Sequence, residues 1–178
     1  LLVNSLNKNF EEAEWFFNSL KIKKNSLTSI ASIISSQVFH QTPILHNELV
    51  NREKLSTNAV SGSLNLISRI FNESDKKNLS MEGHPPEFGI YLSIIKSNNL
   101  HVKNGDDFEF SLKKTKNNSI KIVYDEFLKL IKNSKEAVSV SEIYAHFVKQ
   151  PYGIKLGLLP ILVGLFFKTN ESSCALYT

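Results

Sequence analysis

Two histidines in the N-terminal half of the chain are the first residues with metal-ligand chemistry. His40 and His46 stand six residues apart, and Thr42-Pro43 lies between them. On one continuous helix, side chains at this spacing point in different directions, and a proline after a cap residue predicts a new helix start. The spacing therefore favours histidines at helix ends or on the surface over a metal site.

A second group with reactive side chains comprises the stretch MEGHPP and the single cysteine. Glu82 and His84 flank Gly83 in that stretch, and a carboxylate beside an imidazole can form an acid–base pair. Nothing there positions a nucleophile, so a turn held by side-chain hydrogen bonds is the better interpretation. Cys174 stands among apolar residues, which predicts a small packed thiol rather than a reactive one.

The motifs of the common catalytic sites are absent from the sequence. It contains no G-x-x-x-x-G-K-[ST] phosphate loop, no H-E-x-x-H zinc motif, no C-x-x-C pair and no G-x-S-x-G nucleophile turn. We therefore expect no catalytic, metal-binding or cofactor-binding residue in this chain, and no enzymatic activity of its own.

Lysines form the remaining candidate site, which would contact the backbone of a nucleic acid. Lys113, Lys114 and Lys116 precede a predicted helix that carries Lys121, and such a group could lie along a row of phosphates. The net charge is only +4, from 21 basic and 17 acidic residues, and just two of the basic residues are arginines. Arginine is the side chain best suited to phosphate and guanine edges, so a solvated lysine surface is the alternative interpretation.

Length and composition limit the number of domains and the class of protein that this chain can belong to. The chain has 178 residues, of which 42 % are hydrophobic and 21 % charged, which suits one medium globular domain or two small ones. A single cysteine excludes an internal disulfide, and with no visible signal peptide we expect a cytoplasmic location. Because the chain begins at Leu1 rather than methionine, we interpret it as a piece of a longer protein.

The most apolar stretch, QPYGIKLGLLPILVGLFFKTN, predicts a buried helix. Its apolar part, from Ile154 to Phe167, spans 14 residues, whereas a membrane-spanning helix needs about 20. A helix that begins near Leu156 would place Pro160 in about its first turn, where a missing backbone N–H costs little.

Apolar residues recur at helical spacing along most of the chain. The expected stripes are Phe10, Ala13, Phe17, Leu20; Leu27, Ile30, Ile34, Val38; Val60, Leu64, Ile67, Phe71; Phe88, Tyr91, Leu92, Ile95; and Ile120, Val123, Tyr124, Phe127, Ile131. Cap residues mark several helix starts. The expected starts are Ser26, Ser56, a capping box of Ser139 and Glu142, and Thr42 for a short helix that ends near Arg52.

Two stretches alternate like strands, and together with the helices they predict the fold class. Phe108, Phe110 and Leu112 indicate a short strand or extended arm, and CALYT at residues 174–178 indicates a strand at the end. We expect a mainly α protein. Its parts are a helical bundle at 1–104, a linker or extended arm at 105–118, and a winged-helix-like part with a short β wing at 119–178.

The third helix of a winged-helix unit usually reads bases in the major groove through polar side chains. Here that helix would be Leu156–Phe167, which carries no Arg, Asn, Gln, Ser or Thr. It cannot read base edges by hydrogen bonds, and exposing it would leave a large apolar surface in water. The pattern therefore indicates a winged-helix-like fold without sequence-specific DNA binding.

Three stretches together resemble a known group of proteins: TPILHNELVNREKLSTNAV, MEGHPPEFGIYLSIIKSNNLH, and PYGIKLGLLPILVGLFF with ALY after it. They are similar to segments outside the nucleotide-binding core of large bacterial P-loop ATPases, of the type associated with phage-defence operons such as BREX-like systems. The resemblance implies a cytoplasmic, multi-domain ATPase that works on or near DNA with other proteins. Its motifs are structural, so it assigns no catalytic residue to this chain.

The first function hypothesis is a non-catalytic helical module of a larger ATPase, which serves assembly or coupling. Its partners would be other domains of the same chain or subunits of a defence complex, without a membrane. The alternative is a module that binds the DNA backbone through lysines, independent of sequence. A stand-alone enzyme is the third and weakest hypothesis.

Overall fold

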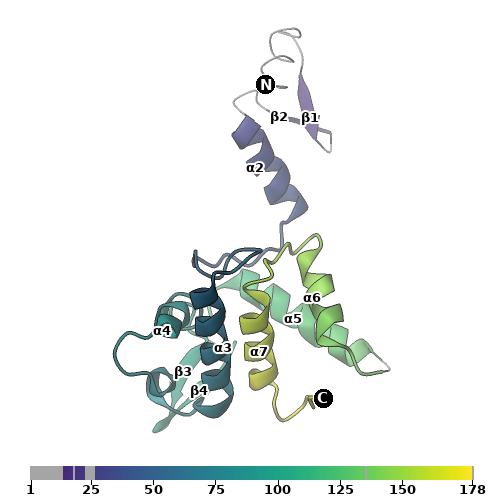
Figure 1. Cartoon of the computed structure of the whole chain (residues 1–178). Helices are drawn as coiled ribbons and strands as arrows, with labels where there is room; N and C mark the ends of the chain where they lie inside the picture. The colour runs from purple at the N-terminus through teal and green to yellow at the C-terminus, as the bar shows by residue number, and fades with distance from the viewer. Residues whose placement is uncertain (1–13, 18, 23–26, 135, 178) are drawn as a thin grey trace. The chain divides into compact units, whose positions relative to one another are not determined.

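The computed structural model describes residues 14–17, 19–22, 27–134 and 136–177. These residues are mainly helical, as we expected. They form two compact units, which divide between His40 and Gln41 and are described separately below (Figure 1).

The first unit contains a small hairpin and one helix. Strand β1, Trp15–Phe17, pairs with β2, Leu20–Ile22, in antiparallel register. Helix α2, Leu27–Val38, confirms the second predicted helix, and Ile30 of its expected stripe is buried. The proposed cap Ser26 lies outside the described residues.

The prediction of a first helix is wrong where it can be checked. Phe17 and Leu20 lie in the paired strands, while Phe10 and Ala13 lie outside the described residues. Three successive aromatic residues favour a pleated strand, and Ser19 adopts a left-handed φ of 63° next to β2. This local preference outweighs an apolar spacing that also fits a helix.

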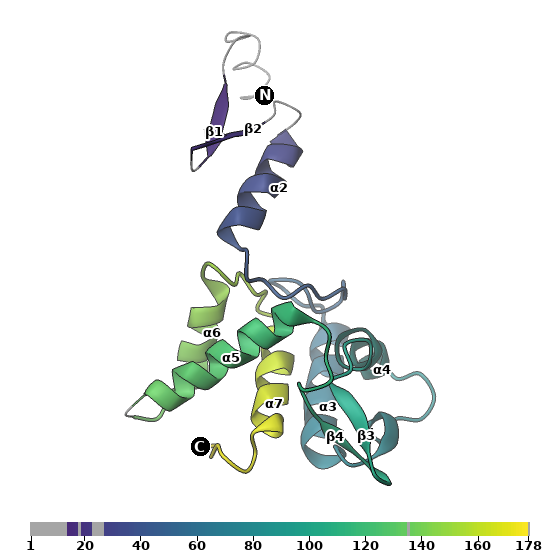
Figure 2. The same ribbon diagram turned by 180° about the vertical axis from the view of Figure 1, so that it is seen from behind.

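The second unit contains the remaining elements, with α3 and α7 side by side (Figures 1 and 2). In chain order they are α3 (Thr57–Asn72), the 3-10 turn η1 (Lys77–Ser80), α4 (Pro86–Ile90), the π-helical turn η2 (Tyr91–Lys96), β3 (His101–Asn104), β4 (Asp107–Phe110), α5 (Asn118–Asn133), α6 (Val140–Val148) and α7 (Leu159–Thr169).

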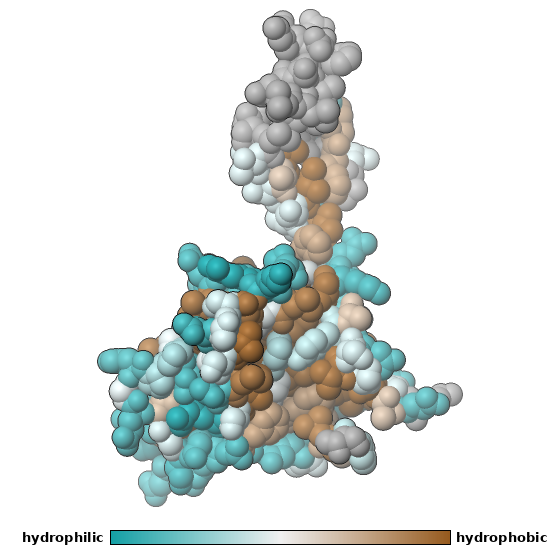
Figure 3. All heavy atoms as spheres, viewed as in Figure 1, coloured by the Kyte–Doolittle hydropathy of each residue, from teal (hydrophilic) through white to brown (hydrophobic). Residues whose placement is uncertain are grey.

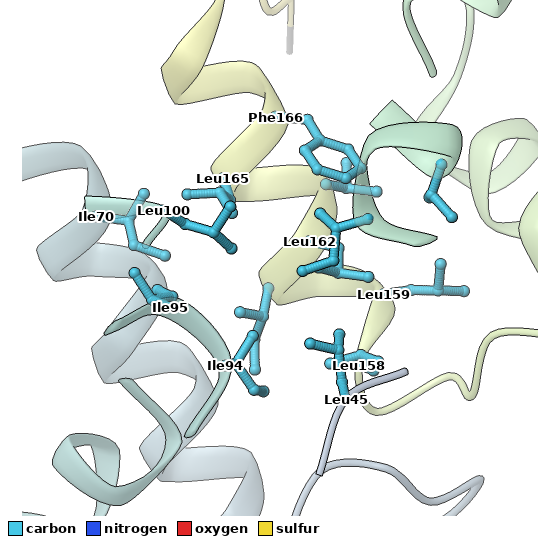
Figure 4. Packing of buried hydrophobic residues seen from close by; sticks show 14 of the residues in the cluster. Leu45, Ile70, Ile94, Ile95, Leu100, Leu158, Leu159, Leu162, Leu165 and Phe166 are labelled. Carbon is cyan, nitrogen blue, oxygen red and sulfur yellow. The ribbon is translucent and has the colours of Figure 1, made fainter. Parts of the chain in front are cut away.

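Helix α7 forms the centre of the hydrophobic core, as its sequence predicted. Leu159, Leu162 and Phe166 are all at most 1 % exposed, and Pro160 stands in the first turn. Figure 4 shows these side chains among residues of α3, η2 and the loop before β3. No helix within the described ranges is both long enough and apolar enough to cross a bilayer.

Helix α3 begins at the predicted cap, Ser56, but buries a different face from the expected one. Val60 and Leu64 are exposed, and Ile67 and Phe71 are only half-buried. The reason is close helix packing. A Cβ added at Gly62 would lie 3.4 Å from Ile90 Cδ1. The small residues of α3 therefore face α4, and the buried set is Ala59, Gly62, Ser63, Leu66 and Ile70.

The helix after Pro85-Pro86 forms, but a π-helical turn changes its inward face. Tyr91 and Ile95 are buried as predicted, whereas Leu92 is exposed and Ile94 is buried in its place. A π turn holds more residues than an α turn, so the predicted α-helical spacing no longer describes one face.

The strand predicted around Phe108 and Phe110 is confirmed as β4, and its partner is β3. A two-residue turn joins them, and Gly105 in this turn has a φ of 64°, a conformation that favours glycine. The sequence Asn104-Gly105 is a hairpin signal that we did not use.

No helix forms between Thr42 and Arg52, which corrects the prediction. The side chain of Asn47 accepts hydrogen bonds from the backbone N–H groups of Leu49 and Val50, at 3.0 and 3.1 Å. Such local side-chain bonds stabilise a turn and compete with helix formation.

The helices of the C-terminal part are confirmed, but its terminal strand is not. The capping box of Ser139 and Glu142 is present at α6, and residues 174–177 form no strand. The two-stranded sheet of this unit precedes α5 instead of following α7. A winged-helix arrangement is therefore not confirmed.

The division into compact units differs from the expected boundary. We expected parts at 1–104 and 119–178 with an arm at 105–118, whereas the structure divides at His40 and places β4 within that arm. The physical reason is α7, whose apolar side chains share one cluster with residues on both sides of the expected arm.

Candidate functional site

The four candidate lysines surround the start of α5. Lys113, Lys114 and Lys116 are exposed in the segment between β4 and α5, and Lys121 is half-buried in the first turns of α5. The N-cap of this helix is Asn117, whose side chain accepts a hydrogen bond from the Ile120 N–H.

Three of these four lysines line two different pockets, and Lys114 lines neither. Lys113 and Lys121 line a pocket of about 490 Å³ together with the acidic residues Glu109 and Asp125. Lys116 lines a second pocket, of about 500 Å³, whose other polar groups are asparagine and serine side chains. The first pocket has as many carboxylates as ammonium groups, so it is not a uniformly basic surface.

The histidines and the glutamate considered for metal or acid–base chemistry, His40, His46, Glu82 and His84, are all exposed. His40 follows α2, and its Nδ1 atom lies 3.1 Å from the carbonyl oxygen of Gln37 in that helix. Glu82 and His84 both lie in the loop before α4. Cys174 is a half-buried free thiol outside any strand. Among the described residues, no group of three or more His, Cys, Asp or Glu is arranged to hold a metal ion.

A buried polar cluster connects η2, β3 and the loop after α3, and sequence reasoning missed it. His101 Nε2 lies 2.8 Å from the Ser74 carbonyl, which can only accept, so Nε2 carries the proton. Nδ1 of the same ring then accepts from the Tyr91 hydroxyl at 2.9 Å. The His101 ring also lies against Phe108 and Phe110 of β4, so this neutral histidine connects the hairpin to the core.

Burial sets the ionisation of both polar members of the cluster. It raises the pKa of Tyr91 to about 12. It also lowers the pKa of His101 below the ordinary value of 6.5, and this effect exceeds the opposing effect of the hydrogen bond to Ser74. Both shifts favour the neutral forms, which suits a structural role rather than proton transfer.

The shift at His101 predicts a stability that falls in acid. As the pH drops below 6.5, the unfolded chain binds a proton at His101 that the folded chain does not, so the free energy of unfolding decreases. Urea denaturation at a series of pH values between about 7.5 and 5 measures this decrease. His101→Gln should reduce the pH dependence, whereas the control His84→Gln, at an exposed site, should retain it. If the free energy of unfolding depended equally on pH in both variants, titratable groups other than His101 would be responsible for the loss of stability in acid.

A second polar contact joins α5 to α6. His146 Nε2 and Glu126 Oε1 lie 3.3 Å apart. They form no hydrogen bond, and Nε2 is buried without a hydrogen-bond partner among the described residues. The His146 ring also lies 5.4 Å from the ring of Tyr152. Burial raises the pKa of Tyr152, and the charge of Glu126 adds to this rise. We interpret the cluster as a contact that positions α6 on α5.

The third polar feature is a pocket of about 380 Å³ on α3 and the start of α4, hereafter the α3–α4 pocket. Arg69 Nε lies 3.4 Å from Glu87 Oε1, and Arg69 Nη1 donates to the Leu79 carbonyl at 3.1 Å. The Glu87 side chain is only 5 % exposed. The pocket is lined by Asn65, Ser68, Arg69, Asn72, Glu73 and Glu87.

The Glu87 carboxylate is only partly satisfied by the described protein atoms. Its Oε2 atom is buried and accepts no hydrogen bond within the described part of the chain. The contact of Oε1 with Arg69 is longer than a typical hydrogen bond. Leaving a buried acceptor unpaired costs about 1–3 kcal/mol, and more for a charged group. The stretch PPEFGI gave no sequence signal for this site, because a glutamate in the first turn of a helix is ordinary.

Comparisons with known proteins give no relative to set beside this geometry. No protein-family model matches the chain, and no curated protein or solved structure matches it either. A function for the chain therefore has to follow from its own residues.

Proposed function

We propose that this chain is a non-catalytic helical module of a larger bacterial ATPase and serves assembly or coupling in phage defence or DNA transactions. In this proposal α5, α6 and α7 make a winged-helix-like unit that contributes packing rather than base recognition. The buried side chains of α7 support this role, because they leave that helix no polar face to offer to DNA.

The observation that carries the proposal is an apolar strip on the outer face of α3. Val60 is 43 % and Leu64 62 % exposed, one helical turn apart. Ile67 and Phe71 continue the strip as half-buried side chains beside Gly164 of α7. Figure 3 shows apolar atoms gathered over α3 and α7 on this face. Contiguous apolar surface of this kind marks protein contact sites, which supports a module that is covered by another domain or subunit.

The test is to place a charge on the strip in the full-length protein that contains this chain. Leu64→Lys should leave the stability of the module within about 0.5 kcal/mol, because the side chain is exposed. It should weaken assembly at least about tenfold, because a lysine would be buried unpaired at the contact. Light scattering across a concentration series measures the assembly state.

A matched control is Ile122→Lys, at a 42 % exposed position of α5. This variant makes the same kind of change away from the strip, and assembly should be unaffected. Unchanged assembly with Leu64→Lys, or equal loss with both variants, would contradict the proposal.

The second candidate function is sequence-independent binding to the DNA backbone. The observation in its favour is that Lys113 and Lys121 share one pocket while Lys116 stands next to the N-terminus of α5. Ammonium groups and a helix N-terminus both attract phosphate. The carboxylates of Glu109 and Asp125 beside the first two lysines weigh against it.

Replacing Lys113, Lys114 and Lys116 by alanine distinguishes the two candidates. For an assembly module we expect DNA affinity to be weak and unaltered by the triple change. For a backbone binder, the log–log salt slope should fall by up to about 3, or roughly 0.9 for each phosphate that the variant no longer neutralises. Fluorescence anisotropy with a labelled duplex at low and moderate salt measures both quantities.

The charge-matched control for this experiment replaces the exposed lysines Lys77, Lys103 and Lys132 by alanine. An equal effect in both triple variants would indicate attraction by net charge alone. Sub-micromolar binding at about 0.15 M salt that only the first variant loses would reverse our ranking of the two functions.

A further inference from the structure

We infer that the α3–α4 pocket binds a primary ammonium group through the carboxylates of Glu87 and Glu73. The inference starts from the buried Glu87 side chain, whose Oε2 atom accepts no hydrogen bond from any described residue. Oxygen atoms of an ionised carboxylate only accept. The missing partner is therefore a donor, and Glu87 is one of the residues that line the pocket.

The charges that line the pocket favour a cationic donor. Glu73 and Glu87 contribute two negative charges, and Arg69 contributes one positive charge, so the lining carries a net charge of −1. Arg69 does not remove the need for a ligand, because its Nη1 group is engaged by the Leu79 carbonyl and its Nε group reaches only Oε1 of Glu87.

The uncharged side chains supply further acceptors around the same space. Asn72 donates its amide nitrogen to the Ser68 carbonyl at 2.8 Å, which directs the donor end of the amide to its own helix and leaves Oδ1 as an acceptor. Ser80 donates to Glu73 Oε2 at 2.9 Å, so Oε1 is the oxygen that Glu73 offers. An ammonium group has three donors and no acceptor, which matches this set.

A divalent metal ion fits the pocket less well than an ammonium group. The Arg69 guanidinium lies 3.4 Å from the Glu87 carboxylate and would repel a doubly charged ion bound at the same group. Mg²⁺ and Ca²⁺ also require about six or more oxygen ligands in a defined geometry. A monovalent ligand with directed N–H donors avoids both difficulties.

The size of the pocket suits the end of an aliphatic amine. A volume of about 380 Å³ is at the lower end of the range for small-molecule sites. Two sources could supply such a group, a free diamine or the lysine side chain of a protein. Both would present the same –NH₃⁺ group to Glu87, and the experiment separates them.

The test titrates this chain with 1,4-diaminobutane and, separately, with Nα-acetyl-lysine methylamide, followed by ¹H–¹⁵N NMR. We expect saturable shifts of the Asn72 side-chain amide and of the Glu87 backbone N–H. Tetramethylammonium, a cation without N–H donors, should cause neither shift. Preferential binding of the diamine would identify a free amine as the source, and preferential binding of the lysine derivative would identify a protein side chain.

Glu87→Gln should raise the Kd for the preferred amine at least about tenfold, because it removes the charge of the side chain while keeping its shape. The matched control Glu136→Gln, at an exposed site between α5 and α6, should leave the Kd unchanged. If Glu87→Gln loses the native NMR spectrum, Glu73→Gln at the half-buried edge of the pocket provides the same test. No saturable shift with either amine up to about 10 mM, or equal binding by the glutamine variant, would overturn the inference.

Discussion

Truncating Leu162 to alanine should lower the free energy of unfolding by about 2–5 kcal/mol, the range for a large buried aliphatic side chain. Leu162 is 1 % exposed in the middle of α7, and Figure 4 shows it among side chains of neighbouring elements. The decrease combines the transfer free energy of the removed atoms with the cost of the cavity that they leave. Urea denaturation followed by circular dichroism measures it.

The same substitution at an exposed leucine is the control for this prediction. Leu64→Ala, on the outer face of α3, removes the same atoms from a side chain that is 62 % exposed. It should change the free energy of unfolding by less than about 1 kcal/mol. An unchanged denaturation midpoint for Leu162→Ala would mean that α7 is exposed and would contradict the fold described above.

Replacing Gly157 by alanine should destabilise the protein by about 1–3 kcal/mol or more. Gly157 is buried in the turn before α7, and a Cβ added there would lie 2.5 Å from the Val50 carbonyl oxygen and in conflict with the Leu55 side chain. The Gly157 N–H also donates to the Arg52 carbonyl at 3.0 Å. Backbone on both sides of the contact would therefore have to move, and thermal or urea unfolding measures the cost.

Gly89 provides a matched control within the same unit. It lies in α4, and a Cβ added there would meet no atom within 4 Å. Because alanine favours a helix over glycine by about 0.8–1 kcal/mol, Gly89→Ala should be neutral or stabilising. If Gly157→Ala were as well tolerated as Gly89→Ala, the close approach of residues 50–55 to the start of α7 would be incorrect.

The elements that the sequence predicted well are those specified by local signals. The capping box of Ser139 and Glu142 and the stripe of Ile120, Val123 and Phe127 identified α6 and α5. The buried character of α7 followed from its composition, since a helix that is apolar on nearly every side has to be enclosed. Such signals act within one or two helical turns and need no knowledge of the partner element.

The inward face of α3 could not be chosen in the same way. Two faces of this helix carry apolar or small residues, and the sequence pattern favoured the larger side chains at Val60 and Leu64. The structure buries the face of Gly62 instead, because small residues let α4 approach closely. Which face of α3 is buried depends on the element that packs against it. Because α4 packs against the face of Gly62, Val60 and Leu64 remain exposed as part of the apolar strip.

By itself, the sequence determined that the protein is mainly helical, that α7 is buried, and that the familiar catalytic motifs are absent. Only the tertiary structure decided which polar residues meet. Arg69 and Glu87 are 18 positions apart, and His101 meets the Ser74 carbonyl across 27 positions. Local signals extend over a few residues, whereas such contacts depend on how α3, α4 and the β3–β4 hairpin pack. The polar pocket and the buried histidine are therefore products of packing, which no short pattern in the sequence specifies.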